Sequence, residues 1–197
     1  MYIAIEGLDG SGGTTQLGWL ASAWARRAPS REVLRTREPS DGPVGRLIRA
    51  QLAGGEVGDE VFPFLFAADR RDHLDRVVLP ALARGAIVLS DRCVLSSLAY
   101  QAAALPPTRI LALHEGFRLP DLVVMLDLDP QVSLARVEAR GGVRDRFETL
   151  DVLRRVRDAY EAGMDALSAR GVAVARIDAA RTPEQVAATI EQAVWPR

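Results

Sequence analysis

Small residues and hydroxyl groups gather near the N-terminus in a stretch whose composition suits phosphate binding. The stretch reads Gly7-Leu8-Asp9-Gly10-Ser11-Gly12-Gly13-Thr14-Thr15 and lies between a short apolar run and a segment with helical periodicity. In that context the backbone N–H groups of the turn can converge on an anion, and the helix N-terminus adds its partial positive charge. We therefore predict that this loop holds the phosphates of a nucleotide. The alternative is a glycine-rich turn that binds nothing.

The loop lacks the lysine that such motifs carry. Gly13 stands at the lysine position, while Thr14 falls on the position of the magnesium-binding hydroxyl. All 25 basic residues of the chain are arginine. A full charge about 4 Å from a phosphate is worth about 4 kcal/mol at an effective dielectric of about 20. We expect an arginine, a metal ion or a partner's residue to supply the missing charge.

Three charged residues follow apparent strand ends, namely Arg37, Asp91 and Arg92. The carboxyl ends of parallel strands meet at one edge of a sheet, where α/β proteins bind their ligands. Because guanidinium forks suit phosphate oxygens, we assign Arg37 and Arg92 to the transferring or accepting phosphates. Either could instead be a surface ion-pair partner. Asp91 is the candidate to share a magnesium ion with Thr14 through water.

An aromatic residue and an arginine, Phe66 and Arg70, have the spacing that places them on one face of a helix. A flat ring beside a guanidinium can stack on a nucleobase and hydrogen-bond to its edge. The alternative is that Phe62 and Phe66 belong to a buried stripe with Arg70 at its rim.

The elements that must position these residues alternate along the chain. Short apolar runs typical of strands lie at residues 2–6, 32–36, 86–90, 122–128 and 172–177, with helical patterns between them. This alternation is typical of βαβ units around a parallel sheet. Runs that are apolar almost throughout indicate helices on both faces. Thr182, Pro183 and Gln185 predict a capped start for the last helix. We predict an α/β fold of three layers, with a central five-stranded parallel sheet, in a single domain over residues 1–197.

Composition limits the partners. The charges nearly balance, with 25 basic and 26 acidic residues and a net charge of −1, which argues against binding to nucleic acid or an anionic membrane. One cysteine cannot form an internal disulfide, and two histidines argue against a histidine-rich zinc site. The first residues are apolar but reach Glu6 at once, so we expect no membrane or export segment and a cytoplasmic protein.

From Thr36-Arg37-Glu38-Pro39 onward the sequence resembles the thymidylate kinase (dTMP kinase) family of P-loop nucleoside monophosphate kinases. Further similar blocks follow in the family's order, at residues 64–70, 90–93, 96–101, 120–130 and 140–148. The resemblance covers most of the chain, from Tyr2 to about Tyr160. It implies a P-loop NTPase fold and transfer of the γ-phosphoryl group of ATP to dTMP for dTTP synthesis. It also implies Mg²⁺ as cofactor and a homodimer.

The resemblance assigns roles to individual residues. Asp9 would hold the 3′-hydroxyl of the acceptor and help to orient its phosphate, although it could instead cap the turn. Phe66 would stack on thymine, while Arg70 and Gln101 would read its edge. The other dTMP-binding positions are Glu38, Pro39, Arg92, Ser97 and Tyr100. The ATP-binding positions are Gly7, Leu8, Asp9, Gly10, Ser11, Gly12, Gly13, Thr14, Thr15 and Arg140.

Residues 140–148 resemble the family's mobile lid, with Arg140, Arg144 and Arg146 beside two glycines. A solvated charged loop is the alternative. Because residues 8–11 contain no base, the chain is similar to the family members that carry a basic residue in the lid. We predict that Arg144 or Arg146 closes over the γ-phosphate and partly covers for the missing lysine. The predicted catalytic set is Asp9, Arg37, Arg92, Arg144 and Arg146.

Two further functions stay open at this point. One is a catalytically impaired nucleotide-binding homologue that acts as a sensor or regulatory partner, for which Gly13 is the argument. The other is a kinase for another monophosphate or for a deoxynucleoside. The departures from the family's pattern spare Phe66, Arg70, Arg92 and Gln101, so base recognition is better preserved than the phosphoryl-transfer machinery.

Overall fold

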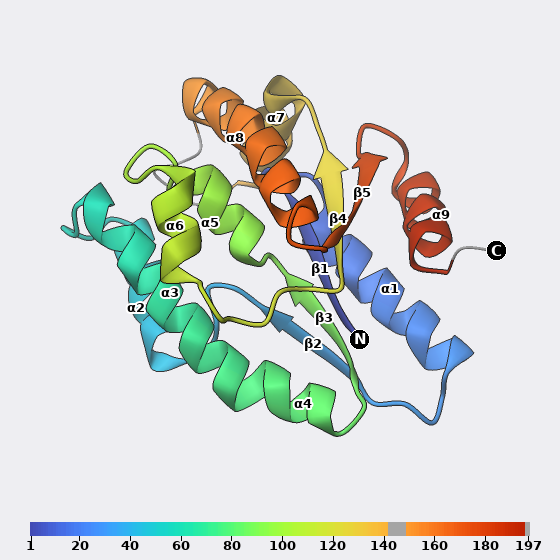
Figure 1. Ribbon diagram of the computed structural model, residues 1–197. Helices are drawn as coiled ribbons and strands as arrows, with labels where there is room; N and C mark the ends of the chain where they lie inside the picture. The colour runs from blue at the N-terminus through green and yellow to red at the C-terminus, as the bar shows by residue number, and fades with distance from the viewer. Residues whose placement is uncertain (142–148, 196–197) are drawn as a thin grey trace.

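One parallel sheet forms the centre of the computed structural model, which describes residues 1–141 and 149–195 (Figure 1). Five strands pair in the order β2-β3-β1-β4-β5. The strands are β1 (Tyr2–Gly7), β2 (Val33–Arg37), β3 (Ile87–Asp91), β4 (Leu122–Asp127) and β5 (Ala173–Asp178). Each predicted apolar run is therefore a strand, with ends that differ by about a residue. The all-parallel sheet with helices around it confirms the predicted fold class.

Two helices cover one face of the sheet, namely α1 (Gly13–Arg27) and α9 (Pro183–Val194) (Figure 1). Ile3 and Ile5 of β1 share a buried cluster with apolar residues of both helices. Since alternate strand residues point to opposite faces, Tyr2 and Ala4 pack on the other side of the sheet. Each strand thus contributes apolar side chains to both faces, as the continuous runs predicted.

Helices from the middle and the last part of the chain pack against that second face. They are η2 (Leu74–Val78), α4 (Leu79–Ala83), α5 (Val94–Tyr100), α6 (Pro107–Leu113) and α8 (Leu150–Ser168). The remaining helices are α2 (Pro43–Leu52), η1 (Asp59–Val61), α3 (Phe62–His73) and α7 (Pro130–Arg140). α2 and α3 pack against each other.

The parallel register fixes where the site must lie. Ile5 of β1 pairs with Asp91 of β3, and Gly7 pairs with Leu126 of β4. The loop after β1 and the turn after β3 therefore leave the sheet at the same edge. The start of the last helix is also as predicted, because Thr182 and Gln185 form a reciprocal capping box at α9.

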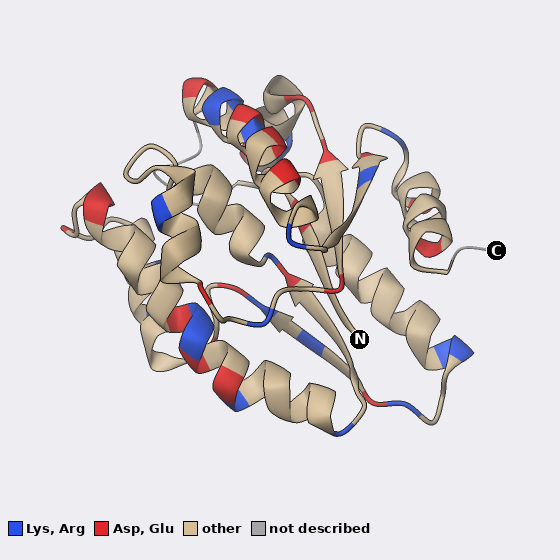
Figure 2. Ribbon diagram, viewed as in Figure 1, with Lys and Arg blue, Asp and Glu red and all other residues tan. Residues whose placement is uncertain are grey.

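The charged residues are interspersed along the helices (Figure 2). Acidic and basic positions alternate on α8 and on the helical stretch from α3 into η2 (Figure 2). Arg71 pairs with Asp75, and Arg76 pairs with Asp72, each one helical turn away. In the described part of the chain, no helix combines the length and the apolar character needed to span a bilayer.

Candidate active site

The glycine-rich loop joins the end of β1 to the start of α1. Within the loop the Ser11 N–H donates to the Leu8 carbonyl at 3.0 Å. Gly12 is the N-cap residue of α1, with φ of 95°, and no described side chain caps the first turn. That turn also has no acidic residue. Its N–H groups are thus available to an anion at the positive end of the helix.

Helix α7 supports the loop from one side. The Ser133 hydroxyl donates to the Asp9 carbonyl at 2.6 Å, and Arg136 donates to the Gly10 carbonyl at 3.4 Å. Gly10 has φ of 79°, and a Cβ there would lie 2.9 Å from the Ser133 carbonyl oxygen. Glycine at position 10 therefore allows both the left-handed turn and the close approach of α7.

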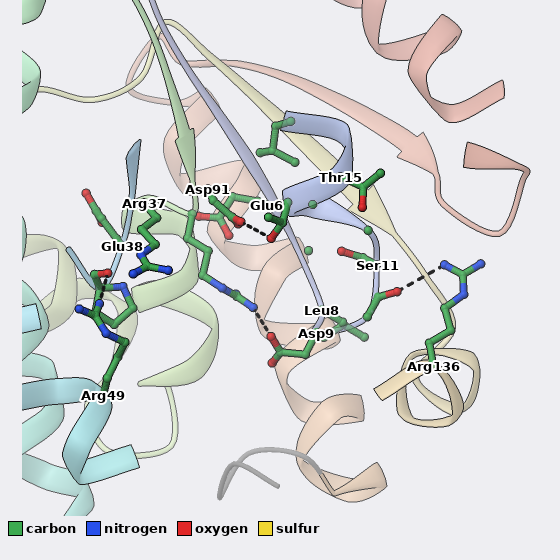
Figure 3. Close-up of a pocket in the computed structure, with 18 residues that line it drawn as sticks. Glu6, Leu8, Asp9, Ser11, Thr15, Arg37, Glu38, Arg49, Asp91 and Arg136 are labelled. Carbon is green, nitrogen blue, oxygen red and sulfur yellow. Dashed lines mark hydrogen bonds and ion pairs between the residues drawn. The ribbon is translucent and has the colours of Figure 1, made fainter. Parts of the chain in front are cut away.

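A cavity of about 410 Å³, here called the loop cavity, opens over the loop (Figure 3). It is lined by residues 5–15 together with Arg37, Glu38, Pro39, Arg49, Asp91, Arg92 and Arg136. Figure 3 shows Arg37 and Arg49 on one side of the cavity and Arg136 on the other, with Asp9 and Ser11 between them. Backbone donors and guanidinium groups thus surround one space, which is the environment that a polyphosphate needs.

Thr14 and Asp91 meet at the floor of the loop cavity. The Thr14 hydroxyl donates to Asp91 Oδ2 at 2.7 Å. Hydroxyl and carboxylate oxygens are metal ligands of the kind that Mg²⁺ prefers. Mg²⁺ is usually held by one or two protein groups together with substrate phosphates. Thr14 and Asp91 therefore fit a magnesium ion that binds together with a nucleotide.

Gly13 begins α1 beside the same pair. A Cβ at this position would lie 3.5 Å from Asp91 Oδ1 and 3.8 Å from the Ile5 side chain, which are ordinary van der Waals distances. The loop therefore has room for the first atom of a side chain, and the missing lysine is not a consequence of crowding.

Arg92 links the loop to the rest of the site. Its Nη2 donates to Asp9 Oδ1 at 2.6 Å, and its guanidinium lies 5.1 Å from the centre of the Tyr100 ring. Burial raises the pKa of Tyr100, so the phenol keeps its proton and donates to Asp9 Oδ2 at 3.1 Å. The Asp9 carboxylate therefore accepts hydrogen bonds from both Arg92 and Tyr100.

Arg37 lies at the loop cavity and also forms a surface ion pair. It lines the loop cavity and also pairs with Asp41 at 2.5 Å, with 56% of its side chain exposed. The hydrogen bond from Arg37 holds the pKa of Asp41 below its ordinary value. Arg37 is thus an exposed guanidinium at the rim of the cavity.

A second cavity of about 230 Å³, here called the helix cavity, lies between α3 and α5. It is lined by Asp9, Glu38, Pro39, Arg49, Leu52, Phe66, Arg70, Arg92, Cys93, Ser96, Ser97, Tyr100 and Gln101. Arg70 and Gln101 are each 3% exposed. Among the described residues, Arg70 Nε and Nη1 and Gln101 Oε1 have no hydrogen-bond partner. Buried polar atoms are rarely left unpaired, so these atoms point to a ligand.

Glu38 fixes the other end of Arg70. Its carboxylate pairs with Arg70 Nη2 and lies 3.2 Å from His73 Nδ1. His73 Nε2 lies 2.6 Å from the Thr36 hydroxyl, so the histidine bridges β2 and α3. This buried network holds the guanidinium at one orientation and leaves its remaining N–H groups toward the cavity.

The sequence is similar to known proteins over nearly its whole length. The family model for thymidylate kinase matches residues 5–190. The chain belongs to the thymidylate kinase family. It is 41% identical over 195 residues to a probable thymidylate kinase of Pyrobaculum aerophilum, which covers 98% of this chain and 95% of that protein. It is also 39% identical over 198 residues to a thymidylate kinase of Xanthomonas oryzae, which covers 100% of this chain and 86% of that protein.

The structure of this thymidylate kinase family member gathers most of the predicted site residues at its two cavities. The loop, Arg37, Asp91 and Arg92 line the loop cavity, and Phe66, Arg70, Ser97, Tyr100 and Gln101 line the helix cavity. Arg140 is the last residue of α7. Arg144 and Arg146, and with them most of the predicted lid, lie outside the described residues, so their assignment stays a prediction.

Several residues that line the cavities were not predicted as site residues, among them Arg49, Arg136 and Glu6. Arg49 donates from α2 to the Pro39 and Ser40 carbonyls, each at 2.7 Å, and lines both cavities. Arg136 reaches the loop from α7. Glu6 is buried directly before the loop, and burial raises the pKa of its carboxyl. Only Glu6 gave a signal in the sequence, because a carboxylate inside an apolar strand needs partners when buried.

Proposed function

We propose that this protein transfers the γ-phosphoryl group of ATP to dTMP, giving dTDP and ADP. The observation that carries the proposal is the junction of the two cavities. Both are lined by Asp9, Glu38, Pro39, Arg49 and Arg92. A nucleotide tail in the loop cavity would therefore meet an acceptor held in the helix cavity. Membership of the thymidylate kinase family supports the same reaction and gives no support to an inactive homologue.

The helix cavity suits thymine. Thymine presents two carbonyl oxygens and one N–H on its edge, which complement the unpaired donors of Arg70 and the unpaired oxygen of Gln101. Cytosine carries an amino group in place of one carbonyl and would set donor against donor at Arg70. Phe66 is partly exposed and lines the same cavity, where its ring can stack on the base.

The loop cavity suits the phosphates. Its first-turn N–H groups and the guanidinium groups of Arg37, Arg49, Arg92 and Arg136 can neutralise charge without a lysine. Thr14 and Asp91 would hold Mg²⁺, which when bound neutralises phosphate charge. Phosphoryl transfer needs mainly positioning and charge neutralisation, so these groups supply what the reaction requires.

The proposed function includes an oligomeric state and a location in the cell. The protein acts as a homodimer in the cytoplasm, without nucleic acid or membrane. Exposed apolar side chains on η1 and the neighbouring helices α2 and α3, Leu47, Val61 and Phe64, support association of two copies. Sedimentation equilibrium of the purified protein tests the dimer, and a monomer at micromolar concentration would contradict it.

The missing lysine has its own test. We expect Arg144→Ala or Arg146→Ala to lower turnover if one of these residues covers for Gly13. The parallel measurement is turnover of Gly13→Lys, for which the loop has space at Cβ. If all three substitutions leave turnover unchanged, compensation by the lid is wrong.

Acceptor preference tests the function as a whole. ADP release with Mg²⁺ and ATP should be fastest with dTMP, slower with dUMP, which lacks the methyl group, and slowest with dCMP. Thymidine serves as the control for a nucleoside kinase. Equal or faster ADP release with thymidine or dCMP would contradict the proposal, as would ATP hydrolysis that does not depend on the acceptor.

A further inference from the structure

Glu6 is a buried carboxylate to which the proposed reaction gives no role. It lies on β1 directly before the loop and is 2% exposed. Its Oε1 accepts from the Cys93 N–H at 2.6 Å and from the Ser96 N–H at 3.0 Å. Its Oε2 accepts from the Ser96 hydroxyl at 2.6 Å and from the Tyr160 hydroxyl at 3.1 Å. Donors from the first residues of α5, from its N-cap residue Cys93 and from α8 thus converge on one carboxylate.

The same two hydroxyls hold the side chain of Arg92. Arg92 Nη1 donates to the Ser96 hydroxyl at 2.9 Å and to the Tyr160 hydroxyl at 3.3 Å. Each hydroxyl has one proton. The Ser96 hydroxyl donates its proton to Glu6, and the Tyr160 hydroxyl can donate to Glu6 or to the Gly7 carbonyl at 3.2 Å. In either case the oxygen lone pairs stay available to the guanidinium. Glu6 therefore sets the direction of the hydrogen bonds that orient Arg92.

The backbone of Arg92 is held in the same place. Its φ is 74°, a left-handed conformation that costs an ordinary residue about 1–2 kcal/mol. The Arg92 N–H donates to the Ile5 carbonyl at 2.9 Å, and the Arg92 carbonyl accepts from the Ser90 hydroxyl at 2.7 Å. The bond from the next N–H, that of Cys93, to Glu6 completes the set. The strained turn is thus fixed on both sides by neighbouring residues of β1.

We propose that Glu6 is a positioning residue that aims Arg92 at the phosphate of the acceptor nucleotide. The inference rests on the proposed function, because Arg92 lies where the two cavities meet. A purely structural role for Glu6, as a cap for the turn before α5, is the competing explanation. The two explanations predict different binding. If Glu6 positions Arg92, its loss weakens binding of the ligand that carries a phosphate. If Glu6 only caps the turn, its loss affects ligands with and without a phosphate alike.

Glu6→Gln keeps the shape of the side chain and separates these explanations. An amide nitrogen cannot accept from the donors that now face one carboxylate oxygen, so the hydroxyls must turn and compete with Arg92. Affinities for dTMP and thymidine are measured by calorimetry on wild type and variant. We expect the ratio of dTMP to thymidine affinity to fall about tenfold or more, with thymidine affinity unchanged.

The matched control is Asp121, which directly precedes β4 and contacts β1 at the end opposite Glu6. Asp121 Oδ2 accepts from the Tyr2 N–H at 2.7 Å and lines neither cavity. Like Glu6→Gln, Asp121→Asn replaces a carboxylate by an amide, in this case one that accepts from the first N–H of β1. We expect it to leave the affinity ratio at the wild-type value.

Tyr160→Phe is the second variant, and it carries the test if Glu6→Gln does not fold. It removes one of the two hydroxyls between Glu6 and Arg92 and should lower the ratio by a smaller factor. An unchanged ratio in the folded variants, or an equal loss for both ligands, would overturn the inference. The proposed function fails separately, if the wild-type protein itself does not prefer dTMP to thymidine.

Discussion

The two cavities of this protein are built from different materials. The helix cavity presents buried side chains of α3 and of the C-terminal end of α5, and Arg70 Nε and Gln101 Oε1 have no hydrogen-bond partner among the described residues. The loop cavity presents backbone N–H groups and several guanidinium groups, of which Arg37 is more than half exposed. A base edge needs a few directional partners, whereas a polyphosphate needs total positive charge and many donors. Substitutions in the loop cavity should therefore change mainly turnover, whereas substitutions in the helix cavity should change mainly the affinity for dTMP.

Arg92→Ala should have the largest effect, because Arg92 lines both cavities and pairs with Asp9. We expect kcat/KM for dTMP to fall on the order of a thousandfold in the ADP-release assay, which is the scale of an arginine that stabilises the transferring phosphate in GTPases. Arg76→Ala removes an arginine whose ion pair with Asp72 lies outside both cavities, and it should leave kcat/KM unchanged. Equal activity of the two variants would show that Arg92 does not contribute to the reaction where the two cavities meet.

Gly13→Lys should raise turnover, and it tests how much the loop cavity lacks. A restored charge at about 4 Å is worth about 4 kcal/mol before desolvation, so the gain in kcat can reach about a thousandfold and should exceed about tenfold. Gly18→Lys adds the same charge further along α1 and should give no gain. Unchanged or lower kcat for Gly13→Lys would mean that the existing guanidinium groups already neutralise the phosphate charge.

Gln101→Ala tests the helix cavity with a smaller expected effect. It removes an oxygen that has no partner among the described residues, and we expect KM for dTMP to rise about tenfold with little change in KM for ATP. Gln16→Ala is the matched control, because Gln16 is also buried with an unpaired Oε1 but lines neither cavity. If Gln101→Ala raised KM for both nucleotides, the claim that the helix cavity binds only dTMP would be contradicted.

Acid stability should change without an effect on either cavity at neutral pH. Burial and the nearby Arg70 charge lower the pKa of His114 to about 4. The unfolded chain binds this proton near pH 6.5 and the folded chain does not, so the free energy of unfolding falls as pH drops from 6.5 to about 4. The loss is on the order of 3 kcal/mol.

His114→Asn should flatten that part of the stability curve in urea titrations at several pH values. The amide can still donate to the Ile110 carbonyl, which now lies 2.8 Å from His114 Nδ1. The same pH dependence in the variant would mean that other groups, such as paired carboxylates, account for the acid loss.

The fold could be predicted because its signals are local. Apolar runs of strand length, the glycine-rich turn and the Thr182 capping box each depend on residues that are close in sequence. Gly7 and Asp91 reach one sheet edge simply because all five strands are parallel. The same rule predicted that Arg37, Asp91 and Arg92 would lie near the loop.

The supporting contacts could not be predicted, because they join residues that are far apart in sequence. Glu6 meets Ser96 and Tyr160 only after β3 and α8 have packed beside β1. Arg49 reaches Pro39 by folding α2 back toward β2. No pattern within a single helix or strand encodes such meetings.

The most direct test is to measure dTDP itself. Purified protein is incubated with Mg²⁺, ATP and dTMP, the reaction is quenched, and the nucleotides are separated and quantified. Amides and guanidinium groups suffice for transfer in our account, so dTDP and ADP should appear in equal amounts and only with all three components. Binding of both nucleotides by calorimetry without any dTDP would contradict it.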